Sequence, residues 1–391
     1  MYRVYHANIK DWAKNYEGPL FDGILCDPPY ELGFMGKSWD SSGIAFDTEM
    51  WADLFRHIKP GGHLLAFSGS RTYHRMAVAI EDAGFEIRDM IEWVYGSGFP
   101  KSLNIGKAVD KVQGNEREYI GEDPIKTAKR PKKNEKQWTT YSATKYDNSI
   151  TKGTSLYEGY GTALKPAHEP CVLARKPISE KNIAENVLRW GTGGINIDAS
   201  RVEHNVEPKF TNRTAPKSNG EKMGTFKENG NMATLNPQGR FPANFIHDGS
   251  DEVEAVFPND NHRFFYSSKS SKSERNAGLE GFEEVEMGRN QSSLDGGKIL
   301  TGSGNERSNT RQNHHPTVKP LALTKYLATL IKPPQGGRLL VPFSGSGSEM
   351  IGALQAGWEE VIGVELTEEY IPIAEARIKH WTKEPDQSSL L

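Results

Sequence analysis

The order of apolar and polar positions divides the chain into two regularly patterned ends and a polar middle. Near the start of the chain, three short and mostly apolar runs predict buried strands. They are Phe21 to Cys26 (FDGILC), HLLAFS from His63, and Phe85 to Tyr95. Between them, Thr48 to Ile58 and Ser70 to Ala83 space their apolar residues as a helix does. Such alternation of strands and helices is typical of an α/β sheet.

Proline and glycine mark the ends of both predicted helices. Lys59-Pro60-Gly61-Gly62 (KPGG) follow the first helix, where we expect the chain to leave the helix because proline cannot donate the next hydrogen bond. Gly84 follows the second helix and is a natural C-terminal cap.

The same alternation returns near residue 320. LALTKYLATLI from Leu321 predicts a helix, and GRLLVPF from Gly337 predicts a strand. A helix over Glu349 to Ala356, a strand from Glu359 (EEVIGVEL) and a closing helix from Glu368 (EEYIPIAEARIKHW) follow. The two ends together predict a doubly wound, mostly parallel α/β sheet.

The middle of the chain has a different character. Two long stretches, from Thr211 and from Met287, are polar and rich in glycine. Better patterned pieces from Asn182 (NIAENVLRWGTGGINID) and Arg240 (RFPANFIHD) lie between and before them, which predicts an insertion with a small core of its own. We therefore divide the chain into a first core part (1–112), an insertion (113–314), a second core part (315–382) and a tail (383–391).

Charge is distributed unevenly along the chain, although the net charge is only −3. Residues 116–320 carry 30 basic against 27 acidic side chains, and residues 126–152 carry 8 against 2, interleaved with aromatic residues. Basic and aromatic side chains together suit contact with phosphates and stacking on bases; a solvated surface loop is the alternative. The candidate nucleic-acid contacts are Lys129, Arg130, Lys132, Lys133, Lys136, Trp138 and Tyr141.

Composition excludes several classes of protein. The 391 residues have a mean hydropathy of −0.65 and include no run of about 18 apolar residues, so no membrane span is expected. The segment MYRVYHANIKDW lacks the apolar core of a signal peptide. Only Cys26 and Cys171 occur, which excludes a disulfide framework and a cysteine-based zinc site. We expect a cytoplasmic protein.

The richest candidate for chemistry is Asp27-Pro28-Pro29-Tyr30, directly after the FDGILC strand. A carboxylate, two prolines of fixed φ and an aromatic ring favour a rigid platform for a flat ligand that carries an amine. A proline-rich turn that caps the strand is the alternative interpretation.

A second candidate lies near the other end of the chain. Phe343-Ser344-Gly345-Ser346-Gly347 separates a predicted strand from a helix, and Glu365 ends the next strand 18 residues after Gly347. Glycines allow close approach of the backbone to a nucleoside, and a carboxylate one strand further accepts hydrogen bonds from ribose hydroxyls. A tight strand–helix turn is the alternative. Gly302-Ser303-Gly304 lacks a preceding apolar strand and is rejected.

In this order, the motifs resemble those of the DNA amino-methyltransferases that use S-adenosylmethionine, in their circularly permuted β-class. DPPY from Asp27 precedes the insertion, and HPTVKP from His315 and FSGSG from Phe343 follow it. KPGG from Lys59 and the GVEL…Y…A…RI pattern from Gly363 also fit. The insertion is similar to that of prophage-borne members.

The resemblance implies a circularly permuted Rossmann-like methyltransferase core with an inserted target-recognition region, and S-adenosyl-L-methionine as cofactor. It implies catalytic roles for Asp27, Pro28, Pro29 and Tyr30. It implies contacts with the cofactor for Asn8, Asp27, His315, Thr317, Lys319, Phe343, Ser344, Gly345, Ser346, Gly347 and Glu365.

Three positions depart from the family's pattern. Val341 stands before Pro342 where an aspartate is usual, Ser348-Glu349 replace Thr-Thr, and Ala7-Asn8 replace Gly-Asp. Each departure weakens the expected grip on the cofactor, although an asparagine at position 8 still offers a hydrogen bond to adenine. We interpret the three as tuning, since Asp27, Tyr30 and Glu365 are present.

These residues suit methylation of an exocyclic amine. Asp27 and the carbonyl of Pro28 each accept one N–H, Tyr30 stacks on the base, and the methyl group moves by direct displacement. A duplex base must first flip out, or the substrate must be single-stranded DNA. No covalent adduct is needed, so we interpret Cys171, which follows Pro170, as a buried thiol on a strand. His314-His315 lack further ligands at metal spacing, and we predict no metal.

We therefore predict an adenine-N6 DNA methyltransferase, because aspartate at the head of the DPPY motif favours adenine in the family. A cytosine-N4 methyltransferase, an RNA methyltransferase and a non-catalytic DNA-binding protein on a decayed scaffold remain the alternatives. Specific and relaxed target recognition, a homodimer, and a restriction-modification or phage setting also stay open.

Overall fold

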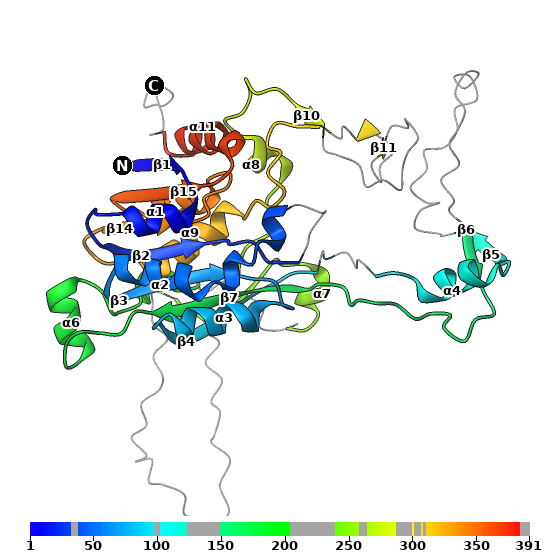
Figure 1. The fold of residues 1–391 in the computed structure, drawn as a ribbon, viewed down its shortest axis with the longest axis horizontal. Coiled ribbons are helices and arrows are strands. Elements are labelled where there is room, and N and C mark those ends of the chain that lie inside the picture. The colour runs from blue at the N-terminus through cyan, green and yellow to red at the C-terminus, as the bar shows by residue number, and fades with distance from the viewer. Residues whose placement is uncertain are drawn as a thin grey trace, which may run out of the picture.

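A computed structural model gives the structure of the chain (Figure 1). It describes residues 1–32, 38–96, 98, 102–122, 149–203, 239–257, 264–286, 299–300, 306–307 and 310–383. Within these residues, nine strands form one sheet in the order β1-β15-β14-β2-β3-β7-β4-β8-β9. The strands are β1 (Tyr2–His6), β2 (Phe21–Cys26), β3 (Ile58–Phe67), β4 (Glu86–Val94), β7 (His168–Arg175), β8 (Phe245–His247), β9 (Phe265–Tyr266), β14 (Arg338–Val341) and β15 (Glu360–Glu365).

Helices cover both faces of this sheet. Residues of α1 (Ile9–Asn15), α2 (Thr48–His57) and α3 (Tyr73–Asp82) belong to one buried apolar cluster. Residues of α9 (Leu321–Leu330), α10 (Ser348–Gln355) and α11 (Ile371–Trp381) belong to the other. Every neighbouring pair in the sheet is parallel except the two that β7 makes with β3 and β4. The predicted doubly wound, mostly parallel α/β fold is confirmed.

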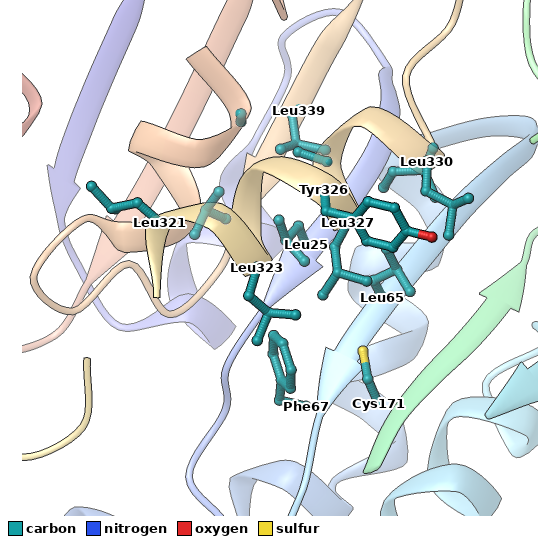
Figure 2. Close-up of a cluster of buried hydrophobic side chains, with 14 of the residues drawn as sticks. Leu25, Leu65, Phe67, Cys171, Leu321, Leu323, Tyr326, Leu327, Leu330 and Leu339 are labelled. Atoms are coloured by element: carbon teal, nitrogen blue, oxygen red, sulfur yellow. The ribbon is translucent and has the colours of Figure 1, made fainter. Parts of the chain in front are cut away.

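The central strand β2 explains how the two faces are built. All six of its residues are buried, as expected for a parallel strand covered on both sides. Successive side chains point to opposite faces, so Leu25 joins the α9 cluster while Ile24 and Cys26 join the other. Figure 2 shows Leu25, with Leu65 of β3, beneath the side chains of α9.

The boundaries of two predicted elements change in the structure. The first predicted helix ends before KPGG (59–62), as expected, but the strand that follows begins earlier than the predicted His63. KPGG lies in β3, and a register shift against β2 between Phe21 and Gly23 accommodates it. Its backbone is held from β7, because the Gly61 amide donates to the Lys176 carbonyl over 3.0 Å. Gly84 caps α3 as predicted, with φ +105.

The prediction of a separate small core in the insertion is wrong for three of its segments. β7, β8 and β9 all come from residues 113–314, and all three extend the main sheet. β7 lies antiparallel between β3 and β4, where its residues 170–175 are buried. The segment around Cys171 was therefore correctly predicted as a strand. Its partner strands are distant in sequence, and local periodicity does not indicate them. The division of the chain into domains stays a prediction.

A smaller unit, at the boundary between the first core part and the insertion, stands apart from the sheet in Figure 1. It consists of α4 (Ile105–Gln113) and the hairpin of β5 (Glu118–Glu122) and β6 (Ser149–Lys152). Arg117 joins its parts, because its guanidinium contacts Asp110 and donates to both carboxylate oxygens of Glu158 over 2.9 and 2.7 Å. The seven predicted nucleic-acid contacts, between Lys129 and Tyr141, lie between these two strands and outside the described residues.

The remaining described elements are short, except for α6, which packs beside β3. They are η2 (Ser38–Ser41), η3 (Ile44–Phe46), α6 (Ile183–Trp190), η4 (Asp198–Ser200), α7 (Asp251–Glu254), α8 (Lys272–Asn276), η6 (Glu368–Tyr370) and the strand pairs β10 (Val285–Glu286) with β13 (Thr310–Arg311) and β11 (Ile299–Leu300) with β12 (Glu306–Arg307). Each helix among the described residues is too short or too polar to serve as a membrane span.

Candidate active site

The two motifs that lie more than 300 residues apart in sequence meet at one edge of the sheet. β2 pairs in parallel with β14, and β14 pairs in parallel with β15. Parallel strands end at the same edge, so Asp27 after β2, the Phe343–Gly347 turn after β14 and Glu365 at the end of β15 are neighbours. The carboxyl edge of an open α/β sheet is also where such folds bind ligands.

The backbone after DPPY is held in an unusual conformation. Glu31 has φ +56, a left-handed geometry that costs a non-glycine residue roughly 1–2 kcal/mol. Its amide donates to Asp40 over 3.0 Å, and its carboxylate accepts the Gly43 amide over 2.8 Å. Thr72 Oγ1 donates to the Tyr30 carbonyl over 2.8 Å. These bonds fix the end of the motif, and sequence analysis did not identify Glu31.

Lys319 joins the DPPY motif to the second half of the chain. Its Nζ lies 2.5 Å from Asp27 Oδ2, 3.0 Å from the Tyr30 hydroxyl and 3.3 Å from Glu169 Oε2. Tyr30 in turn donates to Glu169 Oε2 over 2.8 Å, and Tyr95 donates to Glu169 Oε1 over 3.3 Å. One ammonium group therefore lies among two carboxylates and a phenol.

One oxygen of Asp27 is left over from this network. Asp27 Oδ1 is buried and has no hydrogen-bond partner among the described residues. An unpaired buried carboxylate oxygen is unfavourable by itself. A hydrogen-bond donor of a ligand would satisfy Oδ1, while Oδ2 is already paired.

Electrostatics keeps the members of the network in defined charge states. Burial raises the pKa of Asp27, and the Lys319 charge opposes that rise. Burial alone would lower the pKa of Lys319, but Asp27 and Glu169 outweigh it and raise the pKa. Burial and the two nearby carboxylates raise the pKa of Tyr30, so its hydroxyl remains a donor.

The glycine turn is built around Glu365. Glu365 Oε2 accepts the Gly345 amide over 2.7 Å, and Oε1 accepts the Thr367 amide over 2.8 Å. Gly345 has φ +49, and a Cβ there would lie only 2.8 Å from His315 Nε2. The turn therefore requires glycine both for its backbone and for the imidazole that covers it. HPTVKP and FSGSG, which the sequence predicts at one site, are in direct contact.

The family of the chain follows from comparison with known proteins. A family model described as DNA methylase, N6_N4_Mtase, matches residues 21–376 and so spans both motifs and the region between them. The chain belongs to this DNA methylase family. None of the curated proteins compared with the chain matches it.

Comparison with solved structures gives matches at low identity. The M1.HpyAVI–SAM complex is 16% identical over 97% of this chain and 99% of that one, with a TM-score of 0.42. TTHA0409 of Thermus thermophilus, complexed with S-adenosyl-L-methionine, is 13% identical over 97% and 94% (0.41). PvuII DNA methyltransferase, cytosine-N4-specific, is 11% identical over 96% and 86% (0.41). Likeness at this level carries no argument about the target base.

Arg377 of α11 supports the glycine turn of the methylase from below. The side chain is fully buried, and its Nη1 donates to the Ser346 carbonyl over 2.5 Å, to Ser346 Oγ over 3.0 Å and to Ser348 Oγ over 3.2 Å. Burial lowers the pKa of Arg377 to about 10. Sequence analysis matched this arginine to the closing family pattern but assigned it no role.

The other predicted cofactor residues lie at the same edge, in varied settings. Asn8 caps α1 through Oδ1, which accepts the Lys10 amide over 2.9 Å, and the preceding Ala7 amide donates to the Glu365 carbonyl. Phe343 is partly buried, and Ser344 Oγ is buried without a partner among the described residues. All of these positions border the turn, and their contacts with a cofactor stay predictions.

His315 and Thr317 form a local pair. His315 Nδ1 contacts the Thr317 carbonyl, and the His315 ring lies edge-on to Tyr370 with centroids 4.6 Å apart. Burial lowers the pKa of His315 to about 3, so the ring that covers Gly345 is neutral. In the described part of the chain, no three His, Cys, Asp or Glu side chains are grouped to hold a metal ion.

The departures from the family pattern have clear surroundings. Val341 is fully buried in β14, where its side chain joins the α9 cluster. Glu349 lies in the first turn of α10 and is 4% exposed. Burial, and then the negative charge of Asp27, raise the pKa of Glu349 to about 7. The position that the family fills with threonine therefore carries a carboxyl group between the catalytic and cofactor sides.

Neither cysteine is positioned for covalent chemistry. Cys26 and Cys171 are both buried and free. Burial raises the pKa of each thiol, which opposes formation of a thiolate. The interpretation of Cys171 as a buried thiol on a strand is confirmed.

Proposed function

We propose that this methylase transfers a methyl group from S-adenosyl-L-methionine to the N6 amino group of a flipped-out adenine in DNA, by direct displacement. It belongs, in this proposal, to the circularly permuted β-class. Support for the permutation comes from the order of the strands: the catalytic strand β2 precedes β14 and β15 in sequence but lies beside β14 in the sheet.

The observation that carries the proposal is the free oxygen of Asp27. Oδ1 is buried and without a partner among the described residues, while Lys319 holds Oδ2 and so fixes the direction of the carboxylate. An amine donor fits this oxygen. In the proposed complex, Oδ1 accepts one N–H of the target and the Pro28 carbonyl accepts the other, which aims the nitrogen lone pair away from both.

Tyr30 completes the target side. Its hydroxyl is held by Lys319 and Glu169, so the ring has a fixed orientation on which a base can stack. After transfer the amine is acidic, and Asp27 takes its proton and passes it to water. A fixed ring and a fixed carboxylate reduce the entropy lost when the base is positioned.

The residues on the other side fit the cofactor. S-adenosylmethionine, when bound, supplies the methyl group as an electrophile. Glu365, whose orientation two backbone amides fix, would accept hydrogen bonds from the ribose hydroxyls, since each oxygen keeps a further lone pair. The partnerless Ser344 Oγ and the close backbone of the turn are available to the same ligand.

The proposal is tested by the chemical product. The purified protein is incubated with labelled S-adenosylmethionine and unmethylated double-stranded DNA, and the DNA is digested to nucleosides. We expect N6-methyldeoxyadenosine. N4-methyldeoxycytidine as the sole product would overturn the choice of adenine, and transfer only to a matched RNA would overturn DNA as the substrate.

Absence of any product, with the cofactor bound, would favour the non-catalytic alternative. Sequencing DNA from cells that express the protein, with reads that detect modified bases, identifies the recognised sequence in the same material.

A further inference from the structure

Glu169 is the member of the catalytic network that no motif predicted. It lies on β7, opposite Trp93 in the β4–β7 register. Side chains two residues apart on a strand share a face, so Glu169 points to the same face as Cys171, which belongs to the α9 cluster. Lys319 comes two residues before α9 begins. β7 and the entry to α9 therefore bring Glu169 and Lys319 together.

The carboxylate of Glu169 is fully engaged. Oε2 accepts from Tyr30 over 2.8 Å and lies 3.3 Å from Lys319 Nζ, while Oε1 accepts from Tyr95 over 3.3 Å. Its side chain is 20% exposed and that of Lys319 is 5% exposed. The Glu169 carboxylate therefore contacts both Tyr30, whose ring is proposed to stack on the base, and the Lys319 ammonium, which holds Asp27.

Counting charges shows what Glu169 adds. Lys319 and Asp27 alone form a neutral pair, in which the ammonium would cancel the carboxylate that must accept the target's N–H. With Glu169 the three groups carry a net charge of −1. Lys319 is then shared between two carboxylates, and the free oxygen of Asp27 keeps the negative potential that favours positive charge developing on the target nitrogen.

We infer that Glu169 is a positioning residue for methyl transfer: it shares the Lys319 ammonium with Asp27 and locks the Tyr30 ring, and so keeps Asp27 Oδ1 aimed at the target amine in a negative potential. The inference rests on the proposed function of the same site. Glu169 acts through Lys319 and Tyr30 and is not expected to contact the reacting atoms.

Other ionisable groups surround this network and contribute to its pH dependence. Tyr95 and Lys269 face Glu169 from the β4 side, with Lys269 Nζ 3.5 Å from the centroid of the Tyr95 ring. Asp248 acts on Tyr95 and on Lys269. Glu349 faces Asp27 and Lys319 from α10.

The charge of Glu169 has a defined effect on its two neighbours. It raises the pKa of Asp27, because two nearby carboxylates repel, and it raises the pKa of Lys319, because opposite charges attract. Removing the charge at Glu169 therefore lowers both pKa values. If Asp27 must be ionised for turnover, the acid limb of the pH profile moves to lower pH.

The test compares Glu169→Gln and Glu169→Asp with the wild-type protein in DNA methylation between pH 5 and 10. We expect Glu169→Gln to lower kcat by about 10- to 100-fold, to shift the acid limb to lower pH, and to change the dissociation constant for S-adenosylmethionine by less than about 2-fold. Glu169→Asp restores the charge, so the acid limb of its pH profile lies at the wild-type position. Its kcat stays reduced because the aspartate side chain is shorter.

Glu86→Gln is the matched control. Glu86 lies on β4 opposite Arg175 of β7, to which it is bonded over 2.6 Å. It belongs to the same strand pair as Glu169 but its pair with Arg175 lies six register positions from the pair of Trp93 with Glu169, or roughly 20 Å at about 3.3 Å per residue. We expect Glu86→Gln to keep the wild-type kcat and the wild-type position of the acid limb, even where removing the charge lowers thermal stability.

The outcomes separate this inference from the proposed function. A wild-type protein that binds the cofactor but methylates no DNA overturns the proposed function. An active wild type with a Glu169→Gln variant of normal kcat, or of reduced kcat with an unmoved acid limb, overturns only the role of Glu169. If Glu169→Gln does not fold, Glu169→Asp decides, because normal kcat in that variant would contradict a role that depends on reach.

Discussion

The proposed catalytic side of the site, around Asp27, and the proposed cofactor side, around Glu365, each place a carboxylate at the carboxyl edge of the sheet, but the partners of the two carboxylates differ. Asp27 is held by the Lys319 side chain, which comes from a distant segment. Glu365 is held by the backbone amides of Gly345 and Thr367. Side-chain charges orient one carboxylate, and the fold itself orients the other.

This difference separates the expected effects of substitutions. Removing a charge on the catalytic side should change turnover and its pH dependence without removing the binding site for the cofactor. Changing the turn on the cofactor side should change stability and affinity, because the backbone itself forms the site. The comparison predicts distinct signatures for variants that lie close together.

After substitution of Asp27 itself, the largest effect is expected for Lys319→Met. Without the ammonium, the carboxylates of Asp27 and Glu169 lie close together with no cation between them, so the pKa of Asp27 rises further and a larger share of its carboxyl group is protonated. We expect turnover to fall by about 100- to 1,000-fold, the acid limb to move to higher pH, and unfolding to become easier by roughly 3 kcal/mol. Steady-state kinetics against pH and chemical denaturation measure these changes.

Lys59→Met is the control for this variant. Lys59 is paired with Asp22 over 2.7 Å, between β3 and β2 of the same sheet. The Lys59→Met variant should unfold more easily than the wild type and keep the wild-type turnover. Turnover losses of equal size in the two variants would show that any broken ion pair in the sheet has the same consequence.

A smaller effect, confined to the cofactor side, is expected for Gly345→Ala. The substitution imposes a left-handed backbone on alanine, at roughly 1–2 kcal/mol, and brings its Cβ against the His315 ring. Gly43→Ala isolates the first cost, because Gly43 has φ +78 and no atom within 4 Å of a Cβ. Thermal unfolding of both variants should show the larger loss at Gly345, and equal losses would remove the steric role of His315.

Glu365→Gln should act on affinity. Losing the charge weakens the expected bonds to ribose by about 2 kcal/mol, or roughly 30-fold in the dissociation constant. Turnover at saturating cofactor should stay within about 3-fold. Titration calorimetry with S-adenosylmethionine measures the first quantity. Glu360→Gln, on the same strand but bonded to Arg338, should leave affinity unchanged.

At neutral pH, the smallest effect is expected at the sheet that both sides share. His63 on β3 is 3% exposed, and burial lowers its pKa to about 4. The folded protein therefore keeps His63 neutral while the unfolded chain takes up a proton below about pH 6.5. The contribution of His63 to the free energy of unfolding is therefore fully present above that pH. It falls by up to about 1.4 kcal/mol per pH unit as the pH approaches 4. His63→Gln should flatten this part of the curve, as denaturation at several pH values will show.

The parts of the fold that were predicted are those with local signals. FDGILC and GRLLVPF are continuous apolar runs, and both are buried parallel strands, because such strands must be apolar on both faces. The two motifs could be placed at one site because the residues that follow parallel strands lie at the same edge. The family pattern supplied their order.

The parts that were missed depend on contacts between distant residues. HEPCVLARKP predicts a strand, but nothing in its periodicity indicates that it lies antiparallel between β3 and β4 or that Glu169 meets Lys319, 150 residues later. Lys319 was expected beside the cofactor, while its ammonium contacts the catalytic motif. Partners of a buried charge are chosen by three-dimensional packing, and no spacing rule encodes them.

The most direct test of the division between the two sides measures cofactor affinity and methyl transfer in one preparation of Asp27→Ala. Calorimetry gives the dissociation constant for S-adenosylmethionine, and a single-turnover assay on DNA gives the rate of transfer. The account predicts loss of transfer by about 1,000-fold or more, with affinity within about 3-fold of the wild type. Turnover similar to the wild type, or a loss of affinity as large as the loss of transfer, would contradict it.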